Sequence, residues 1–325
     1  MKNIDMYFLS DIKIFHIYNK YIMHMISYYN ESGYLELLKD VCKFGEQKKT
    51  RNGEVYSRFG IIITFDKFPL LTTKKMFTRG IIEELLWFLR GSTNAKELQE
   101  KCVYIWDGNS SREYLDSVGL HHYAEGELGP VYGWQWRKFG KAYNNENING
   151  LNNDNNEGFD QIKYVLEELM KPDNSRRAVL SAWNPSQLAE MALPPCHMIY
   201  TFYKDNSGLS CLMNMRSSDL FLGLPFNLAS TAILTHIIAK VLHISNVAKI
   251  SIVITDAHVY KEHIDAVNTQ IKNDCMPPPT FNIKKDAPPI SSSLNEKLAW
   301  IEGLTCEDFE IIGYTSAAAI KAPMK

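Results

Sequence analysis

Helix-like and strand-like segments follow one another in this chain of 325 residues without a repeating order, and this irregularity is its strongest constraint on the fold. A regular strand-helix alternation would predict parallel β-α-β units, but neither that period, nor a glycine-rich phosphate loop, nor an internal repeat is present. The pattern therefore predicts one α+β domain. Apolar spacing predicts helices over residues 34–42, 78–90, 160–170 and 228–242, and strands over 59–65, 178–183, 198–203, 210–216 and 250–255.

Composition excludes several classes of protein. Hydrophobic residues make up 45% of the chain and charged residues 22%, which is typical of a globular protein. Lys and Arg number 35 against 37 Asp and Glu, and the net charge of -2 excludes a polycationic surface for nucleic acid. No apolar run approaches about 18 residues, so no membrane-spanning helix is predicted. The six cysteines include no Cys-x-x-Cys pair, which favours a reducing, cytoplasmic location over a disulfide scaffold or a zinc finger.

Two stretches stand apart from the regular pattern. In residues 1–30, acidic residues interrupt the apolar stretches, so the segment matches neither a secretory signal nor a mitochondrial presequence. It is predicted to be an N-terminal extension, and residues 31–325 are predicted to form the single folded domain. The Asn-rich residues 144–156 predict a surface loop inside that domain, because closing a longer loop costs little extra free energy.

One cysteine has a setting that suits a nucleophile. Two prolines precede Cys196 in the sequence MALPPCH and fix the approach of the backbone to a predicted strand. A nucleophilic thiolate needs a nearby cation or hydrogen-bond donor, which neighbouring strands can supply. By position alone, a small buried cysteine without catalytic function is the more frequent case, so both interpretations stay open.

Arginines recur where predicted elements end. Arg51 lies in a glycine-containing turn, and Arg176 and Arg177 precede a buried strand. Arg216 ends another strand, beside Ser217. Each alone is more simply a solvated surface residue, but an arginine in such a place can also bind a phosphate through two hydrogen bonds. Their recurrence predicts a small anionic ligand.

The predicted helix 78–90 carries a carboxylate at the margin of its apolar face. Glu83 lies nearly opposite that face, where it is expected to be solvated and paired with Arg79. Glu84 lies at the edge, and a carboxyl group in such a place tends to have a raised pKa, which suits proton transfer near neutrality. An ordinary surface residue is the equally weighted alternative for Glu84.

Two further segments place polar groups beside apolar ones. Asn227 follows the sequence DLFLGLPF, and it either caps the next helix or offers a donor and an acceptor to a planar heterocycle. His258 and Tyr260 follow a predicted strand, which is consistent with recognition of a hydroxyl group. His258 and His263 are five residues apart, the wrong spacing for two ligands on one helical face, so no metal site is predicted.

From about residue 34 to the C-terminus, a series of motifs occurs in order: TTKK, IIEELLWFL, YIWDGN, ELGPVYGWQWR, NSRRAVLSAW, MALPPCH, RSSDLFLGLPFN, TDAHVY and IKAPMK. This series resembles the folate-dependent, cysteine-nucleophile thymidylate synthase family. The segment WDGNSSREYLDSVGL is similar to a longer insertion of its eukaryotic members. The resemblance implies that family's fold, a mixed β-sheet flanked by helices, with the sheets of two subunits packed across a homodimer.

The resemblance also implies an activity: transfer of a one-carbon unit from methylenetetrahydrofolate to dUMP, giving dTMP and dihydrofolate. Cys196 would add to carbon 6 of the uracil and make carbon 5 a nucleophile. Arg216 would help to stabilise the thiolate. Glu84 matches a proton-relay carboxylate at the uracil carbonyl, and Tyr132 a tyrosine associated with loss of the carbon-5 proton.

The resemblance further implies how the two substrates are held. In the nucleotide site, Asn227 would contact the uracil edge, and His258 with Tyr260 the ribose hydroxyl. The phosphate would be held by Arg51, Arg216 and Ser217, with Arg176 and Arg177 reaching across from the partner subunit. The positions that match the folate site are Trp106, Asn109, Asp219, Gly223 and Phe226.

Two positions depart from the family pattern. Met215 stands where the family usually has a glutamine, and it cannot donate the hydrogen bonds of an amide. The chain ends in Lys325, where the family typically has a short apolar residue whose carboxylate helps to close the site over folate. Closure excludes water and completes the site, so this terminus leaves open the alternative of impaired turnover with nucleotide binding retained.

Two alternative functions stay open. One is a deoxypyrimidine monophosphate hydroxymethylase, which forms the same covalent cysteine adduct but completes the reaction by adding water to the exocyclic carbon. Asn227 favours uracil over cytosine, because the amino group of cytosine would prefer an Asp acceptor. The other is a catalytically impaired nucleotide-binding paralogue, which the joint presence of Cys196, Glu84 and Asn227 disfavours.

Overall fold

The computed structural model describes residues 27–143, 157–173 and 175–324. Most of the predicted extension 1–30, the Asn-rich loop 144–156 and Lys325 lie outside the described residues, so those predictions stay predictions.

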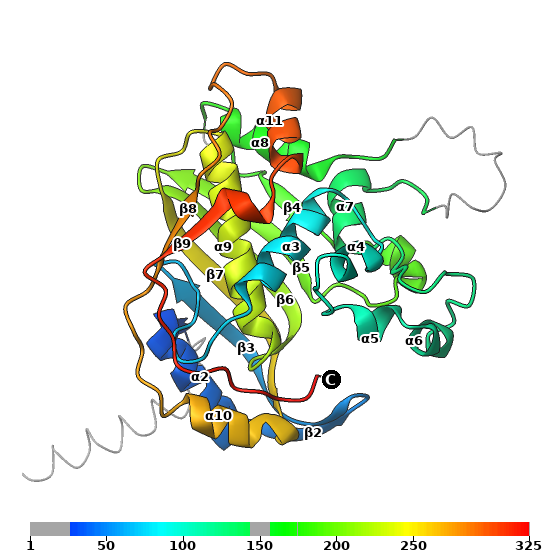
Figure 1. Ribbon diagram of the computed structural model, residues 1–325, viewed down its shortest axis with the longest axis vertical. Helices are drawn as coiled ribbons and strands as arrows, with labels where there is room; N and C mark the ends of the chain where they lie inside the picture. The colour runs from blue at the N-terminus through cyan, green and yellow to red at the C-terminus, as the bar shows by residue number, and fades with distance from the viewer. Residues whose placement is uncertain (1–26, 144–156, 174, 325) are drawn as a thin grey trace, which may run out of the picture.

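A seven-stranded mixed sheet forms the centre of the fold, in the order β1-β3-β7-β6-β5-β4, with β2 paired to β3 (Figure 1). β1 runs parallel to β3 and β6 parallel to β7, while the other neighbours are antiparallel. A separate ladder joins β8 and β9. This confirms the predicted α+β class. The strands are β1 (Ser27–Tyr29), β2 (Glu46–Thr50), β3 (Gly53–Phe65), β4 (Val179–Ser181), β5 (His197–Asp205), β6 (Gly208–Asp219), β7 (Val247–Tyr260), β8 (Thr280–Ile283) and β9 (Phe309–Ile312).

Helices flank this sheet, as expected. The long helix α9 packs against β6 and β7, and α2 packs against β3 and β7. The α-helices are α2 (Asn30–Phe44), α3 (Thr78–Leu89), α4 (Lys96–Gln99), α5 (Asp107–Ser110), α6 (Arg112–Ser117), α7 (Tyr132–Lys138), α8 (Gln161–Met170), α9 (Gly223–Val241), α10 (Ile264–Gln270) and α11 (Leu294–Glu302). Short 3-10 turns are η1 (Pro185–Glu190), η2 (Lys261–His263) and η3 (Cys306–Asp308).

The strands of the central sheet bury one face more fully than the other. In β7, Ile250, Ile252 and Ile254 are buried, whereas the intervening residues Ser251 and Val253 are only half-buried. Side chains alternate between the two faces of a strand, so the isoleucines point toward the helices that form the core. The opposite face stays partly open in a single chain.

Helix α9 is apolar on all sides because it lies inside the fold. It is long and apolar enough to cross a bilayer by length and composition, yet 78% of its most apolar window is buried within the structure. Packing in the core therefore accounts for its hydrophobicity. α9 also begins at Gly223, five residues before the predicted start. Pro225 falls in the first turn, where its missing N–H is tolerated.

The hairpin of β2 and β3 differs from the prediction in extent. The expected turn at residues 51–53 is present, and Gly53 takes a φ of 134° that side-chain-bearing residues rarely adopt. β3 starts at this turn rather than at residue 59, and it pairs with β2, whose five residues are all exposed. Hydrophobic patterning has no signal for so polar a strand.

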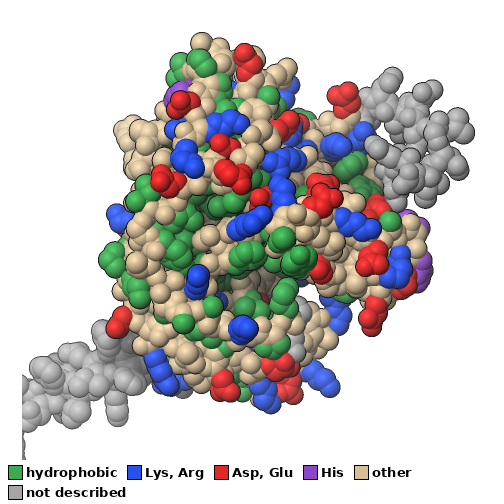
Figure 2. Space-filling model, viewed as in Figure 1, with side chains coloured by type: hydrophobic (Ala, Val, Ile, Leu, Met, Phe, Trp, Pro, Cys, Tyr) green, Lys and Arg blue, Asp and Glu red, His purple; other side chains and the backbone are tan. Residues whose placement is uncertain are grey.

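On the face of the molecule shown in Figure 2, hydrophobic side chains gather around a hollow near the middle, and charged side chains are scattered over the rest.

Candidate active site

Cys196 and Arg216 are held together at one end of the sheet. Cys196 lies just before β5, and its carbonyl oxygen accepts a hydrogen bond from the Arg216 N–H on β6 at 3.0 Å. The Arg216 side chain donates to the carbonyl oxygens of Pro195 (2.9 Å) and Pro194 (2.8 Å), and its Nη2 lies 3.5 Å from the Cys196 sulfur. The two proline carbonyls thus fix the guanidinium beside the thiol, so a cation lies next to Cys196.

Two effects oppose one another at the Cys196 thiol. Burial raises its pKa above the ordinary value, and the positive charge of Arg216 lowers it by a smaller amount. In the ligand-free site the thiol is therefore mainly protonated at neutral pH. Arg216 is placed to stabilise the thiolate once a proton acceptor removes the proton.

Tyr132 and His197 form an aromatic wall beside this thiol. Tyr132 begins α7, and its hydroxyl oxygen accepts a hydrogen bond from the Cys196 N–H at 2.8 Å. The His197 ring stacks on Tyr132 with centroids 4.2 Å apart, and its Nδ1 lies 2.6 Å from the Tyr200 hydroxyl. Burial lowers the pKa of His197 to about 3, so its ring is neutral. The sequence interpretation did not single out His197, although its place next to Cys196 was an available signal.

Glu84 projects from α3 into the same region. The Trp106 indole N–H donates to its Oε1 at 2.8 Å. Burial raises the pKa of Glu84 to about 7, and the hydrogen bond from Trp106 acts in the opposite direction. The phenol of Tyr132 experiences the charges of Cys196, Glu84 and Arg216, which places all four groups in one neighbourhood. Glu84 can thus give or take a proton near neutrality, as predicted.

The prediction for its neighbour Glu83 was wrong. Glu83 is 5% exposed and forms an ion pair with Lys101 at 2.6 Å, rather than lying in solvent beside Arg79. The helical wheel placed this residue opposite the apolar face of α3. Residues 96–102 and 306–308 cover that side of the helix, and a single-helix pattern cannot show this packing.

A pocket of about 210 Å³ opens at the same end of the sheet. Strand register explains its composition, since Ser217 on β6 lies opposite Asp256 on β7, and Asp219 opposite His258. His258 Nδ1 lies 3.1 Å from Asp256 Oδ1, which also accepts a hydrogen bond from Ser57 at 3.0 Å. The lining residues are Thr50, Arg51, Asn52, Val55, Ser217, Asp256, His258 and Tyr260. Four predicted nucleotide-site residues therefore meet in one pocket.

The first two turns of α9 carry three further predicted residues. Asn227 lies inside the helix, so the alternative that it caps the following helix is wrong. A Cβ placed on Gly223 would lie 3.8 Å from the Asp219 side chain and 3.9 Å from Asn227 Oδ1. Gly223 therefore lies between a predicted folate residue and a predicted uracil residue, both within ordinary van der Waals distance of that Cβ position. Phe226 is half-buried and packs against the core.

Trp106 and Asn109 come from a different part of the chain but reach the same region. Trp106 is 8% exposed, and its ring lies 6.0 Å from that of Tyr132. Asn109 is in α5, where its backbone N–H donates to the Trp106 carbonyl at 3.1 Å, and it is half-buried. The hydrogen bond from Trp106 to Glu84 connects these predicted folate positions to the predicted proton-relay carboxyl group.

Arg176 and Arg177 are not brought to this pocket within the chain. Both are exposed and directly precede β4, at one edge of the central sheet. Arg51 lies beside β3, which β7, β6 and β5 separate from β4. Met215, which stands before Arg216 where the family pattern has a glutamine, is 1% exposed and contributes to the core.

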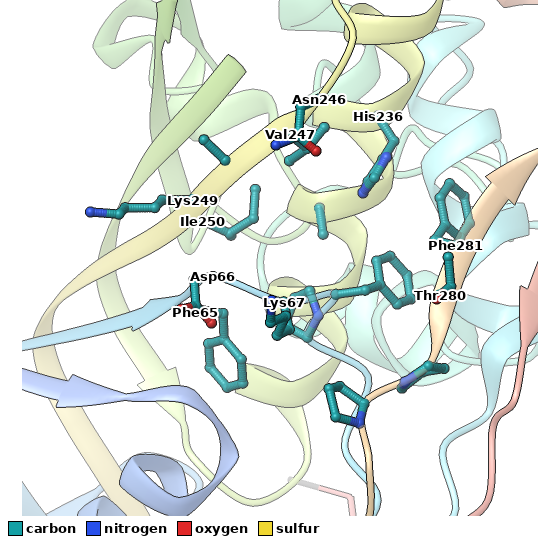
Figure 3. Close-up of a pocket in the computed structure, with 16 residues that line it drawn as sticks. Phe65, Asp66, Lys67, His236, Asn246, Val247, Lys249, Ile250, Thr280 and Phe281 are labelled. Atoms are coloured by element: carbon teal, nitrogen blue, oxygen red, sulfur yellow. The ribbon is translucent and has the colours of Figure 1, made fainter. Parts of the chain in front are cut away.

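A second pocket, of about 300 Å³, lies at the far end of β3 and β7 (Figure 3). His236 of α9 packs there against Phe68 and Phe281. The predicted site residues line neither this pocket nor its rim.

Comparison with known proteins identifies the family. A family model described as thymidylate synthase matches residues 32–325. The chain belongs to the thymidylate synthase family. The resemblance carried by the ordered motifs is thereby confirmed, and the mixed sheet with flanking helices is the fold of a thymidylate synthase family member. In the part of the chain that the structure describes, no group of three or more His, Cys, Asp or Glu residues is placed to hold a metal ion.

Several curated relatives are bifunctional dihydrofolate reductase-thymidylate synthases. That of Zea mays is 46% identical over 300 residues, covering 91% of this chain and 54% of the relative. That of Glycine max is 47% identical over 286 residues, covering 86% of this chain and 51% of the relative. That of Paramecium tetraurelia is 44% identical over 300 residues, covering 91% of this chain and 61% of the relative. The chain thus spans about half to three-fifths of the length of these relatives.

Proposed function

We propose that this chain catalyses the reductive methylation of dUMP to dTMP, with methylenetetrahydrofolate as one-carbon donor and reductant and dihydrofolate as the second product. The observation that carries the proposal is the Cys196 thiol, fixed 3.5 Å from the Arg216 guanidinium. Tyr260, which lines the pocket of about 210 Å³, interacts electrostatically with both Cys196 and Arg51. Membership of the thymidylate synthase family supports the same reaction.

The pocket suits a nucleoside monophosphate. Arg51 and Ser217 line it and supply donors for a phosphate, and Arg216, the residue before Ser217 on β6, adds a guanidinium at this end of the sheet. His258 and Tyr260 supply polar groups for a ribose hydroxyl, and the contact between His258 and Asp256 holds the imidazole ring in place. Asn227 offers one amide donor and one acceptor to the edge of a uracil ring.

Covalent addition begins the proposed reaction. The Cys196 thiolate forms a bond to carbon 6 of the uracil, and the electron pair of the carbon 5–carbon 6 double bond moves toward the carbonyl at carbon 4. Glu84, with a pKa of about 7, can relay a proton to that oxygen. Carbon 5 becomes nucleophilic and takes up the one-carbon unit. Loss of the carbon-5 proton, in which Tyr132 takes part, accompanies breaking of the bond between the one-carbon unit and the folate nitrogen. A hydride from the tetrahydrofolate so formed reduces this carbon to a methyl group and leaves dihydrofolate, and the Cys196 sulfur departs as the ring double bond re-forms.

The residues near α9 and α5 fit a folate. Its chemistry supplies the carbon and the hydride that reduces it. The carboxylate of Asp219 can accept hydrogen bonds from a pterin-type ring, and Gly223 adds no side chain beside it. Trp106, Asn109 and Phe226 present aromatic and amide surface on the neighbouring elements. These side chains bind and orient the co-substrate and exclude water from the reacting carbon.

The proposal includes a homodimer. Arg176 and Arg177 are exposed at the β4 edge, away from the pocket of their own chain, so they are available to the phosphate site of a partner. The less buried face of the sheet suits packing against a second sheet. A reducing compartment such as the cytoplasm belongs to the proposal too, because the Cys196 thiol must stay reduced.

The test follows both products. Protein incubated with dUMP and methylenetetrahydrofolate is expected to form dihydrofolate and a nucleotide with the mass of dTMP. Cys196→Ser should abolish turnover, while Cys102→Ser, at an exposed cysteine outside the site, should not. A hydroxymethyl product would show a hydroxymethylase instead, and nucleotide binding without turnover would show an impaired paralogue.

The dimer is tested by mixing two inactive variants. Refolding Cys196→Ser together with Arg176→Ala/Arg177→Ala is expected to restore partial activity, because one site of each mixed dimer has an intact cysteine and intact partner arginines. Absence of recovery, with both variants folded, would contradict the shared site.

A further inference from the structure

His263 is buried next to the candidate site and has no part in the reaction described above. It ends η2 and is 0% exposed. Its ring packs edge-on against Tyr260 with centroids 5.3 Å apart and tilted against Phe221 at 5.6 Å. These contacts fix the direction of its two ring nitrogens.

The two nitrogens of His263 face two different parts of the chain. Nε2 lies 2.8 Å from the carbonyl oxygen of Pro323, and because a carbonyl oxygen only accepts, Nε2 is the donor. Nδ1 faces Asp219 Oδ1 at 3.6 Å, slightly longer than a hydrogen bond, and this contact is an ion pair when both ring nitrogens carry a proton. The imidazole ring therefore lies between the C-terminal segment and Asp219.

Asp219 is held on one side only. Its Oδ1 accepts a hydrogen bond from the Phe221 N–H at 2.9 Å and faces His263. Within the residues that the structure describes, Oδ2 accepts no hydrogen bond. One carboxylate oxygen is thus fixed by the protein while the other is left for a ligand.

The C-terminal segment is attached in two places. Near residues 314–318, the Ala317 N–H donates to the Thr72 carbonyl at 2.8 Å, and the Tyr314 hydroxyl donates to the Leu71 carbonyl at 2.8 Å. Beyond Ala318, among the residues described up to Met324, the hydrogen bond from His263 to Pro323 is the one that joins the segment to the rest of the chain. His263 therefore anchors this end by a hydrogen bond, next to the apolar packing of Ile320 and Ala322 against the core.

We propose that His263 is a positioning residue that couples docking of the C-terminal segment to the orientation of Asp219. The inference deepens the proposed function and depends on it for the identity of the Asp219 ligand, a folate. A folate bound to Asp219 would then favour the docked segment, and the docked segment would favour folate binding by the same factor.

Three substitutions separate the two contacts. In His263→Gln the amide nitrogen takes the place of Nε2, so the contact with Pro323 is kept and the one with Asp219 is lost. In His263→Asn the amide nitrogen takes the place of Nδ1, which reverses the pattern. His263→Phe keeps a ring of similar shape and removes both contacts.

Hydrogen exchange of residues 319–324 measures docking directly. Without ligands, exchange should be faster in the Asn and Phe variants by about fivefold, the effect of one hydrogen bond, and unchanged in the Gln variant. In the wild type, dUMP with tetrahydrofolate as an unreactive probe should slow this exchange. In the Gln variant the same pair of ligands should slow it less. Equal exchange in the Asn and Gln variants would overturn the proposal.

Steady-state kinetics supply the second readout. The KM for methylenetetrahydrofolate should rise about fivefold or more in the Gln and Phe variants, while the Kd for dUMP stays unchanged. An unchanged folate KM in both variants would overturn the proposal. A wild-type protein without turnover would contradict the proposed function instead, while ligand-free exchange would still decide whether His263 holds the segment.

Discussion

Replacing Glu84 by glutamine is expected to stabilise the folded protein in mildly alkaline solution and to leave its stability in acid unchanged. Burial raises the pKa of this carboxyl group from 4.5 to about 7. Between these two pH values the unfolded chain loses the proton more readily than the folded one, so the free energy of unfolding falls as the pH rises. Glutamine carries no charge, and its amide oxygen can still accept the hydrogen bond from Trp106.

The size of the effect follows from the shift. The pKa of Glu84 rises from 4.5 to about 7, a difference of about 2.5 pH units. At about 1.36 kcal/mol per unit, the charged Glu84 lowers the free energy of unfolding by about 3.4 kcal/mol once the pH exceeds both values. The Glu84 residue keeps some exposure, so solvent reduces the cost. We therefore expect Glu84→Gln to raise the free energy of unfolding by about 2 to 3 kcal/mol near pH 8 and by about zero near pH 4.

Urea unfolding followed by circular dichroism measures this difference at the two pH values. Glu100→Gln is the matched control, because Glu100 is exposed and its substitution should have the same small effect at both. An equal gain at both pH values, or a loss near pH 8, would refute the reasoning. Turnover should fall strongly in Glu84→Gln at either pH, since an amide cannot relay the proton.

Two further predictions concern buried titratable groups. Burial lowers the pKa of His197 to about 3, so between about pH 6.5 and 3 the unfolded chain binds a proton that the folded chain does not. The free energy of unfolding should therefore fall, as the pH is lowered, by up to about 1.4 kcal/mol per pH unit. In urea unfolding between about pH 7 and 4.5, His197→Phe should show a shallower loss of stability, and an unchanged slope would contradict the assignment. Lys101→Met should leave Glu83 buried without its partner and lower the free energy of unfolding by roughly 1 to 3 kcal/mol near pH 7. The double variant Glu83→Gln/Lys101→Met should recover most of that loss. Absence of recovery would mean that loss of the ion pair is not the cause.

Much of the fold was predictable from the sequence because its elements have strong local signals. The apolar face of residues 78–89 and Gly91, at φ 73°, mark α3 and its end. The weaker predictions fail where local signals conflict with packing. β2 has no apolar face, and α9 begins five residues before its predicted start because Gly223 and Pro225 fit its first turn.

The candidate site was predictable in its residue types but not in its geometry. Cys196 and Arg216 were separate candidates, and only the three-dimensional arrangement shows the guanidinium bound to the two proline carbonyls that precede the thiol. Glu83 was misplaced because the segment that carries Lys101 covers it from another part of the chain. Arg176 and Arg177 stay predictions, since a phosphate site shared between subunits cannot be seen in one chain.

The hydrogen bond from Ser57 to Asp256 has a consequence for how the protein folds. It joins residues 199 positions apart, and the pocket beside it forms only where β3 meets β7. Contacts of such long range form slowly, because the chain must lose much conformational freedom before they stabilise it. We therefore expect this pocket to be among the last parts of the molecule to assemble, so that nucleotide affinity appears in refolding only after the helices have formed.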